Sequence, residues 1–290
     1  MSDDQSALFA EANFDPAQLG EFAYASRKLP EYMHLRLLIC GRCDMLYASP
    51  APPPGLLSAA YNDAAFDSGP EAHFAARTYG SFLPNICSNL PDRIGAVDIG
   101  TGDGAFIEQL IEHRFTDVIG VEPSAAPIAA AAATIRPLIR HDIFKPGSFA
   151  PGSVSLVTCF QTIEHVPDPL SLCREAWKIL KPGGAIFLVG HNRRAFSAKV
   201  LGRKSPIFDI EHLQLFSPDS FRHLLSAAGF ESISVKPFIS KYPLHYWMKL
   251  FPLPAGVKHV VISSLKAMRL GFMPIPLPAG NLTAVAYKPK

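Results

Sequence analysis

The stretch Val97–Phe106, which reads VDIGTGDGAF, decides the fold that this sequence predicts. A short apolar run leads into it and a segment with helical spacing follows it, so a strand is expected to end here and a helix to begin. Glycines at such a junction let the backbone turn tightly and approach a ligand without a Cβ in the way. The stretch therefore predicts a strand–turn–helix unit that binds a ligand at its turn.

From Arg93 onward, short β-branched runs alternate with helical segments, which predicts an α/β fold with a mostly parallel sheet. The predicted strands are Ile94–Ile99, Val118–Val121, Leu138–Phe144, Val154–Phe160, Ala185–Gly190, Glu231–Pro237 and Leu282–Tyr287. The predicted helices are Ala105–His113, Ala125–Ile135, Pro169–Leu180 and a segment that opens at Ser217 and ends at Gly229. Residues 191–216 and 238–280 are too long for plain connections, and such insertions in compact domains are often functional.

The 290 residues, 48% of them hydrophobic, are enough for one large domain with an added segment. We expect an N-terminal segment of mixed and partly helical structure over 1–90 and an α/β domain over 91–290, with a cap insertion at about 238–280. Within the N-terminal segment, Leu56–Tyr61 and Glu71–Phe82 are predicted helices that follow a proline-rich break.

Three acidic residues lie at the ends of three consecutive predicted strands. Asp98 precedes Gly100 by two residues, and Glu122 and Asp142 end the second and third strands. The carboxyl ends of parallel strands share one edge, where such sheets bind ligands. Glu122 could accept both hydroxyls of a ribose, and Asp142 could accept from an adenine amino group. An acid beside the turn also suits a cationic ligand better than a pyrophosphate.

Six segments occur in a fixed order within about residues 93–235: VDIGTGDG, GVEPS, RHDIF, CFQTIEHVPDP, ILKPGGAIFLVGHN and EHLQLFSPDSFRHLLSAAGF. This ordered set resembles the class I S-adenosylmethionine-dependent methyltransferases. The resemblance implies a Rossmann-like sheet of seven strands, mostly parallel with the last strand antiparallel, and helices on both faces. It implies S-adenosylmethionine as the cofactor, with binding residues Asp98, Gly100, Thr101, Gly102, Gly104, Glu122, Pro123, Asp142, Ile143, Phe160 and Gln161.

Two histidines are candidate catalytic residues, His165 in IEHVP and His212 beside Glu211. A neutral imidazole can take a proton from an acceptor hydroxyl near pH 7. Positioning alone supplies much of the rate of a methyl transfer, so a base is optional. A packing or hydrogen-bonding role for His165, and a role for His212 in orienting a lid, stay open.

Cys40 and Cys43 form a Cys-Gly-Arg-Cys motif that is similar to half of the zinc-binding region at the start of sugar C-methyltransferases. No cysteine precedes Cys40, and two ligands do not close a tetrahedral zinc site. We therefore expect a degenerate remnant without a metal, and the sequence predicts no metal ligand elsewhere.

The net charge of +2 argues against a nucleic-acid partner. Residues 236–290 nevertheless contain eight Lys and Arg and no acid, and a second basic run surrounds Arg193 and Arg194. That second run either favours an anionic acceptor or is a solvated loop. Residues 242–270 either cap the acceptor pocket or contact an anionic membrane surface as an amphipathic helix.

These observations predict an S-adenosylmethionine-dependent methyltransferase that acts on a small-molecule, glycan or lipid acceptor at oxygen or carbon. Two alternatives stay open: an NAD(P)-dependent oxidoreductase with the same layered fold, and a non-catalytic methyltransferase-like binding module. The start of the chain lacks a basic and apolar leader, and no run of roughly 18 apolar residues occurs, so we expect a cytoplasmic protein.

Overall fold

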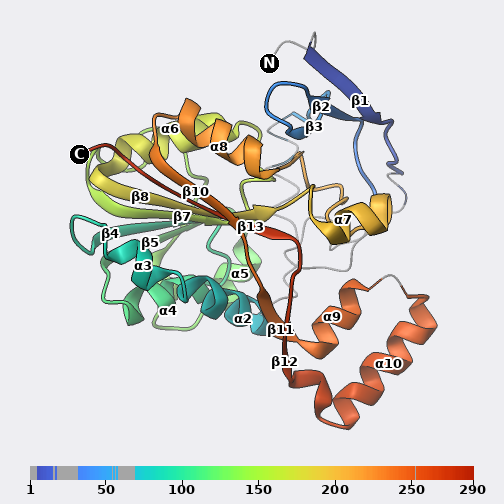
Figure 1. The fold of residues 1–290 in the computed structure, drawn as a ribbon. Coiled ribbons are helices and arrows are strands. Elements are labelled where there is room, and N and C mark those ends of the chain that lie inside the picture. Colours follow the sequence, from blue (N-terminus) through green and yellow to red (C-terminus); the bar gives the residue numbers. More distant parts are fainter. Residues whose placement is uncertain are drawn as a thin grey trace.

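A computed structural model describes residues 5–15, 17, 32–53, 55, 57, 69–251 and 253–290, and its arrangement is shown in Figure 1. The predicted helix Leu56–Tyr61 lies outside the described residues except for Leu57. None of the described helices combines the length and the apolar character that a membrane-spanning segment needs.

A seven-stranded sheet forms the centre of the molecule, in the order β10-β13-β8-β7-β4-β5-β6. Its strands are β4 (Ile94–Ile99), β5 (Thr116–Glu122), β6 (Ile139–His141), β7 (Val154–Phe160), β8 (Leu180–His191), β10 (Glu231–Pro237) and β13 (Asn281–Tyr287). Strands β6, β5, β4, β7 and β8 pair in parallel, whereas β13 is antiparallel to both β8 and β10. The predicted mostly parallel sheet with an antiparallel last strand is confirmed. Strand order reverses between β4 and β7, the position where such sheets open a crevice for ligands.

Helices cover both faces of this sheet (Figure 1). Side chains of α6 (Pro169–Ile179) and α8 (Pro218–Ala227) pack into one hydrophobic cluster, and those of α2 (Gly69–Gly80), α3 (Leu83–Cys87) and α4 (Ala105–Glu112) into another. Helices α2 and α3 precede residue 91, yet they belong to the layer that covers the sheet.

Three predicted elements differ by more than two residues at one end. Helix α5 ends at Ala130 rather than Ile135, because the guanidinium of Arg136 donates to the carbonyls of Ala129 and Ala131 and satisfies the helix end there. The predicted strand Leu138–Phe144 is reduced to β6, since the 3₁₀ turn η3 (Arg136–Leu138) precedes it. Strand β8 begins at Leu180, five residues before the predicted start at Ala185, because Leu180 already pairs with Val154.

The N-terminal segment is mixed, as predicted: its predicted helix Glu71–Phe82 corresponds to α2, and the described residues before it include strands. Strands β1 (Ser6–Ala10), β2 (Leu37–Cys40), β3 (Leu46–Ala48) and β9 (Gln214–Leu215) make an antiparallel sheet. Leu37, Leu46 and Ala48 are buried against Phe208 and Leu215. The small N-terminal sheet is thus completed by a strand and a hydrophobic cluster that come from the middle of the chain.

The insertion between β10 and β13 forms a cap beside the sheet (Figure 1). It consists of β11 (Ser240–Pro243), α9 (Leu244–Leu250), α10 (Ala255–Ala267), η5 (Leu270–Phe272) and β12 (Pro274–Leu277), with β11 and β12 paired antiparallel. His245 of α9 holds the cap to α2, because its Nε2 lies 3.4 Å from Oε1 of Glu71. Its Nδ1 lies 2.7 Å from the carbonyl oxygen of Gly271 within the cap. The shorter insertion after β8 contains α7 (Phe196–Leu201) and η4 (Gly202–Lys204).

Candidate active site

The glycine turn between β4 and α4 has the left-handed backbone that its sequence predicts. Gly100, Gly102 and Gly104 have φ angles of 69°, 60° and 79°. A Cβ at Gly100 would lie 2.2 Å from Oγ1 of Thr162, and one at Gly104 would lie 2.4 Å from Cγ2 of Ile135. A Cβ at Gly102 would meet no atom of the described residues within 4 Å. The outer two glycines thus permit close packing of the protein, whereas Gly102 keeps space open for a ligand.

Asp98 lies buried beneath this turn. Its carboxylate accepts hydrogen bonds from Oγ1 of Thr101 at 2.7 Å and from Oγ1 of Thr158 at 2.6 Å. Burial raises the pKa of Asp98 to about 6, against the opposing effect of the two hydroxyls. The side chain is therefore an anion above pH 6 that a cationic ligand would stabilise.

Glu122, at the end of β5, is tied to the glycine turn. Its Oε2 accepts from the backbone N–H of Gly102 at 2.8 Å, and its Oε1 accepts from that of Ser124 at 2.9 Å. Burial raises the pKa of Glu122. Each carboxylate oxygen has a second lone pair, so these bonds position the group and still leave it able to accept from ribose hydroxyls.

Asp142 and Ile143 follow β6 at the same edge of the sheet. The ammonium of Lys145, 2.9 Å from Oδ2, lowers the pKa of the exposed Asp142. Ile143 is 49% exposed although it is a large apolar residue, and it lines the central cavity together with Pro123. An exposed aliphatic side chain inside a cavity is a surface on which a flat aromatic base can rest.

Phe160 and Gln161 follow β7. The Phe160 ring packs against the rings of Phe106, Tyr79 and Phe187, with centroids between 4.5 and 4.9 Å apart. Gln161 has a φ of 49°, and its N–H donates to the carbonyl of Val189 at 2.7 Å. This strained turn redirects the chain from β7 into the loop that carries His165.

A cavity of about 1130 Å³ joins these residues to a second group. Of the predicted cofactor-binding residues, all but Gly104 line it. Gly104 lies behind the turn, where it packs against Ile135. The other end of the cavity is lined by His165, His191, Glu211 and His212 and by cap residues that include Tyr242, Tyr246, Trp247, Leu250 and Phe251. The volume slightly exceeds the range of about 300–1,000 Å³ of single-ligand pockets, so two ligands can share it.

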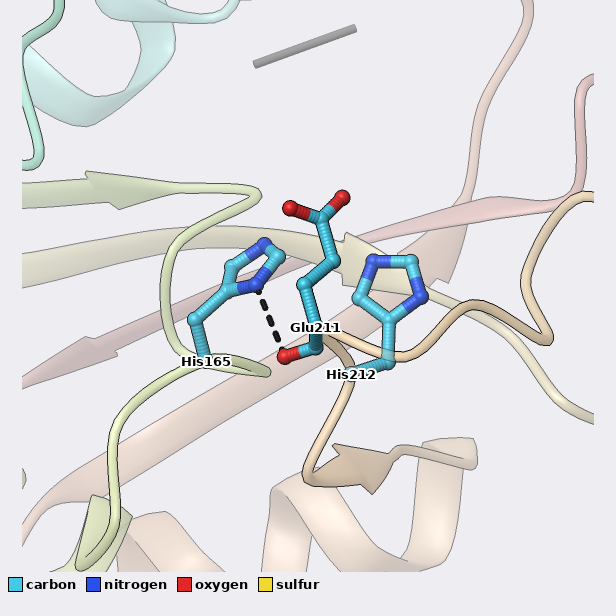
Figure 2. Close-up of side chains that lie close together, drawn as sticks. All are labelled: His165, Glu211 and His212. Carbon is cyan, nitrogen blue, oxygen red and sulfur yellow. Dashed lines mark hydrogen bonds between the residues drawn. The ribbon is translucent and has the colours of Figure 1, made fainter. Parts of the chain in front are cut away.

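His165, Glu211 and His212 converge at this second end, as Figure 2 shows. Nδ1 of His165 lies 3.1 Å from the carbonyl oxygen of Glu211, and Nδ1 of His212 lies 2.9 Å from that of Ile207. The two rings are 4.9 Å apart between centroids. Burial lowers the pKa of His165, so its imidazole is neutral near pH 7.

Glu164 brings the two halves of this cluster together. Its carbonyl accepts from the N–H groups of Leu213 and Gln214, and its Oε1 accepts from the N–H of His191 at 2.6 Å. The amide of Gln214 donates to the carbonyls of Ile163 and Val166 on either side of His165. Hydrogen bonds from the backbone and from the Gln214 side chain therefore hold the loop after β7 against the segment around Glu211.

Glu211 and His191 were not selected from the sequence as site residues. The signal for Glu211 was its place beside His212, but a single Glu-His pair does not indicate which partner faces a cavity. The cap residues lie in the segment 242–270, for which a cap over the acceptor pocket was one of two predictions. Their place in the cavity depends on how the insertion packs on α2.

The two arginines of the basic run after β8 do not lie on the acceptor side of the cavity, where the anionic-acceptor hypothesis placed them. Arg193 and Arg194 do not line the cavity; both bind Asp44 of the N-terminal hairpin, with Nε of Arg194 2.9 Å from Oδ2. Arg194 lowers the pKa of Asp44 to about 2. The two guanidinium groups attach the N-terminal sheet to the α/β domain, and the anionic acceptor stays a prediction.

Cys40 and Cys43 are both buried and form no disulfide. The turn that holds them connects β2 to β3, and the N–H of Asp44 donates to the carbonyl of Cys40 at 3.0 Å. The motif thus closes the hairpin that presents Asp44 to the two arginines.

The sequence matches the profile of a family described as a methyltransferase domain over residues 72–235, more than half of the chain. The chain belongs to the class I S-adenosylmethionine-dependent methyltransferases. Membership of this family rules out the oxidoreductase alternative. The cofactor of the family, S-adenosylmethionine, fits the cavity in two respects: the open space at Gly102 and the buried carboxylates of Asp98 and Glu122, which suit a cation and a ribose.

Relatives and structural neighbours of this methyltransferase are distant. A ubiquinone biosynthesis O-methyltransferase of Pseudomonas aeruginosa is 32% identical over 117 residues, 37% of this chain and 49% of the relative. A protein of the same description from Pectobacterium carotovorum is 25% identical over 54% of this chain and 61% of its own length. The chain thus spans about half the length of the first of these curated relatives and less than two thirds of the second.

Two solved structures share the fold. The YcgJ protein of Bacillus subtilis has a TM-score of 0.54 at 15% identity, with 74% of this chain and 99% of that protein covered. A SAM-dependent methyltransferase of Thermotoga maritima has a TM-score of 0.50 at 20% identity, with 75% and 91% covered. At these identities the likeness establishes the fold of the methyltransferase.

The raised pKa of Asp98 predicts a pH dependence of cofactor binding. Below pH 6 the carboxyl is protonated and neutral; above pH 6 it is an anion that attracts the positive charge of the cofactor. We expect affinity for S-adenosylmethionine to fall by up to about tenfold per pH unit below 6 and to level off above it. Calorimetric titration at a series of pH values measures this. An Asp98→Asn variant should bind weakly with a flatter profile, and a pH-independent wild-type affinity would contradict the prediction.

Proposed function

We propose that this protein transfers the methyl group of S-adenosylmethionine to a hydroxyl oxygen of an apolar small molecule. The observation that carries the proposal is the continuity of one cavity from the glycine turn to the histidine cluster and the apolar cap. The relatives from Pseudomonas and Pectobacterium are described as O-methyltransferases, which supports oxygen as the methylated atom.

Different residues of the cavity bind the cofactor and the acceptor. The bound cofactor supplies an electrophilic methyl group on a sulfonium. Glu122 and the glycine turn orient the adenosyl part, and the rings around Phe160 exclude water from the middle of the cavity. His165, Glu211 and His212 hold the acceptor hydroxyl and promote loss of its proton. Positioning of the two reactants supplies much of the rate.

The cap supports an apolar acceptor. Tyr242, Tyr246 and Trp247 lie with ring centroids 4.7 to 6.5 Å apart, and the indole N–H of Trp247 donates to the carbonyl of Ile275 rather than to the cavity. Three aromatic rings, of which Trp247 has its N–H engaged outside the cavity, form a wall for an aromatic or aliphatic molecule. This composition favours a hydroxylated apolar molecule over a nucleotide-linked sugar.

The test is methyl transfer from radiolabelled S-adenosylmethionine to two sets of acceptors: phenols and alcohols with apolar tails, and nucleotide-linked sugars. We expect label in the first set, released as a methyl ether. Labelling of the sugars alone would contradict the proposed acceptor class. Tight cofactor binding without labelling of either set would favour the non-catalytic alternative.

We also propose that the cap contacts an anionic membrane surface from which an apolar acceptor can enter. Phe251, Val260, Met268 and Phe272 each expose more than half of their surface. Residues 236–290 contain eight basic side chains and no acid. Exposed apolar side chains among basic ones are the composition of an interfacial segment, and Phe251 also lines the cavity.

Cosedimentation with vesicles tests this contact. We expect binding to vesicles of phosphatidylglycerol and phosphatidylcholine, and weak binding to phosphatidylcholine alone, since the lysines need an anionic partner. A Val260→Glu, Phe272→Glu double variant should lose most of the binding. Ile111→Glu on α4, a substitution of an exposed apolar residue outside the cap, is the matched control. Equal sedimentation of all three proteins would refute the contact.

A further inference from the structure

We propose that His165, Glu211 and His212 bind a divalent first-row transition metal ion at the acceptor end of the cavity. Among the described residues, the ligand atoms of these three side chains all lie within 4.8 Å of one another, which is near enough to share one ion. Metal ligands around a single ion lie roughly 3 to 3.5 Å apart when each bond is about 2.1 Å long. Small side-chain rotations therefore complete the site.

The hydrogen bonds of both rings favour metal binding. In each imidazole, Nδ1 lies within 3.1 Å of a backbone carbonyl oxygen, a geometry that suits the tautomer with the proton on Nδ1. Metal-binding histidines characteristically donate their other ring N–H to a carbonyl or carboxylate in this way. Figure 2 shows the Glu211 carboxylate between the two rings, with a ring nitrogen of each on the carboxylate side.

The backbone around the cluster is rigid enough to preserve this geometry. Leu213 and Gln214 donate to the carbonyl of Glu164, and the N–H of His212 donates to the carbonyl of Asp209 at 3.1 Å. Glu211 and His212 are buried, and His165 is half-buried at the cavity wall. Two imidazoles and one carboxylate on the wall of a ligand cavity leave coordination positions open, the arrangement of catalytic rather than structural metal sites.

The role of this ion rests on the proposed methyl transfer, whereas its binding does not. An acceptor hydroxyl bound at an open position would have a lowered pKa and would lose its proton to solvent water. The oxygen then attacks the methyl carbon, the carbon–sulfur bond breaks, and its electron pair stays on sulfur, which gives a methyl ether and S-adenosylhomocysteine. By lowering the pKa of the hydroxyl, the ion would make a general base such as His165 unnecessary, and it would favour acceptors that carry a hydroxyl oxygen.

The experiment measures metal binding and methyl transfer separately. Chelator-treated protein is titrated with Co²⁺, followed by its visible absorption, and with Zn²⁺ and Mn²⁺ by calorimetry. A Cys40→Ser, Cys43→Ser background removes the thiols as competing ligands. We expect one ion per chain, with affinity reduced at least about 100-fold in His212→Ala and Glu211→Gln. The exposed His223→Ala, on α8, is the matched control and should bind like its parent.

Two further readouts separate this inference from the proposed function. Affinity for S-adenosylhomocysteine without metal reports whether each variant is folded, and we expect it unchanged in Glu211→Gln. Methyl transfer should be lost on chelation and restored by metal. Full transfer by the metal-stripped protein would overturn the role of the ion in the reaction, and equal metal affinity in the parent and in Glu211→Gln would overturn the metal site. Either result would leave the methyltransferase proposal standing. Specific metal binding without any methyl transfer would keep the site and refute the proposed function.

Discussion

Gly102→Ala should weaken binding of S-adenosylmethionine about 100-fold, equivalent to about 3 kcal/mol, while the protein remains folded. Among the residues that the structure describes, the added Cβ meets no atom within 4 Å, so it projects into the cavity at the glycine turn. There it would occupy volume that the cofactor needs. Calorimetry with S-adenosylmethionine measures the loss, and thermal unfolding measures the stability.

Gly152→Ala is the matched control for this variant. Gly152 has a φ of 62°, close to the 60° of Gly102, and a Cβ there also meets no atom within 4 Å. Both substitutions place alanine in the left-handed region, at a cost of about 1–2 kcal/mol in the free energy of unfolding. Gly152 does not line the cavity, so its variant should bind the cofactor normally. Equal affinity in the two variants would show that the cofactor does not lie against Gly102.

His165→Ala should lower kcat by about 100- to 10,000-fold and leave the affinity for S-adenosylhomocysteine within about twofold of the wild type. His165 lines the acceptor end of the cavity, opposite the glycine turn, and its ring meets the Glu211–His212 segment. Its loss therefore affects the acceptor hydroxyl and spares the cofactor. Single-turnover methyl transfer with a hydroxylated apolar acceptor provides the rate, and calorimetry provides the affinity.

A catalytic role of His165 must be distinguished from a role in stabilising the loop after β7. If His165 only stabilised the loop, His165→Ala would lower the thermal unfolding temperature and the affinities for both ligands together. His165→Gln, which restores a hydrogen bond to the Glu211 carbonyl, would then recover turnover. Full turnover in His165→Ala with intact cofactor affinity would remove this residue from the reaction.

The cofactor end of the site was predictable because it is built from local sequence. The turn from Ile99 to Gly104 is one continuous segment, and its left-handed φ angles are those that glycine permits. Glu122 and Asp142 were recognisable because each ends a strand, and parallel strands bring their carboxyl ends to one edge. The hydrogen bond from Gly102 to Glu122 spans 20 residues, but the alternation of strands and helices already placed its partners together.

The acceptor end was predictable only in part. His165 and His212 were both candidates, yet their meeting requires that residues 46 positions apart, His165 and Glu211, come into hydrogen-bond contact. No local pattern in the sequence indicates this contact, since it depends on hydrogen bonds between two distant segments, made by the carbonyl of Glu164 and the amide of Gln214. The same holds for Arg194, whose charge suggested an anionic acceptor until its partner Asp44, 150 residues earlier, was located.

The sequence by itself determined the layered α/β fold and the glycine turn, because strand and helix periods and glycine geometry are properties of short segments. The antiparallel final strand was implied only by the resemblance to the methyltransferase family. Only the tertiary structure decided that β1, β2 and β3 form a sheet completed by β9 and that the cap encloses the cavity. It also decided that the side chains of His165, Glu211 and His212 lie close together. These features arise from packing between distant segments, where burial and hydrogen bonding outweigh local preference.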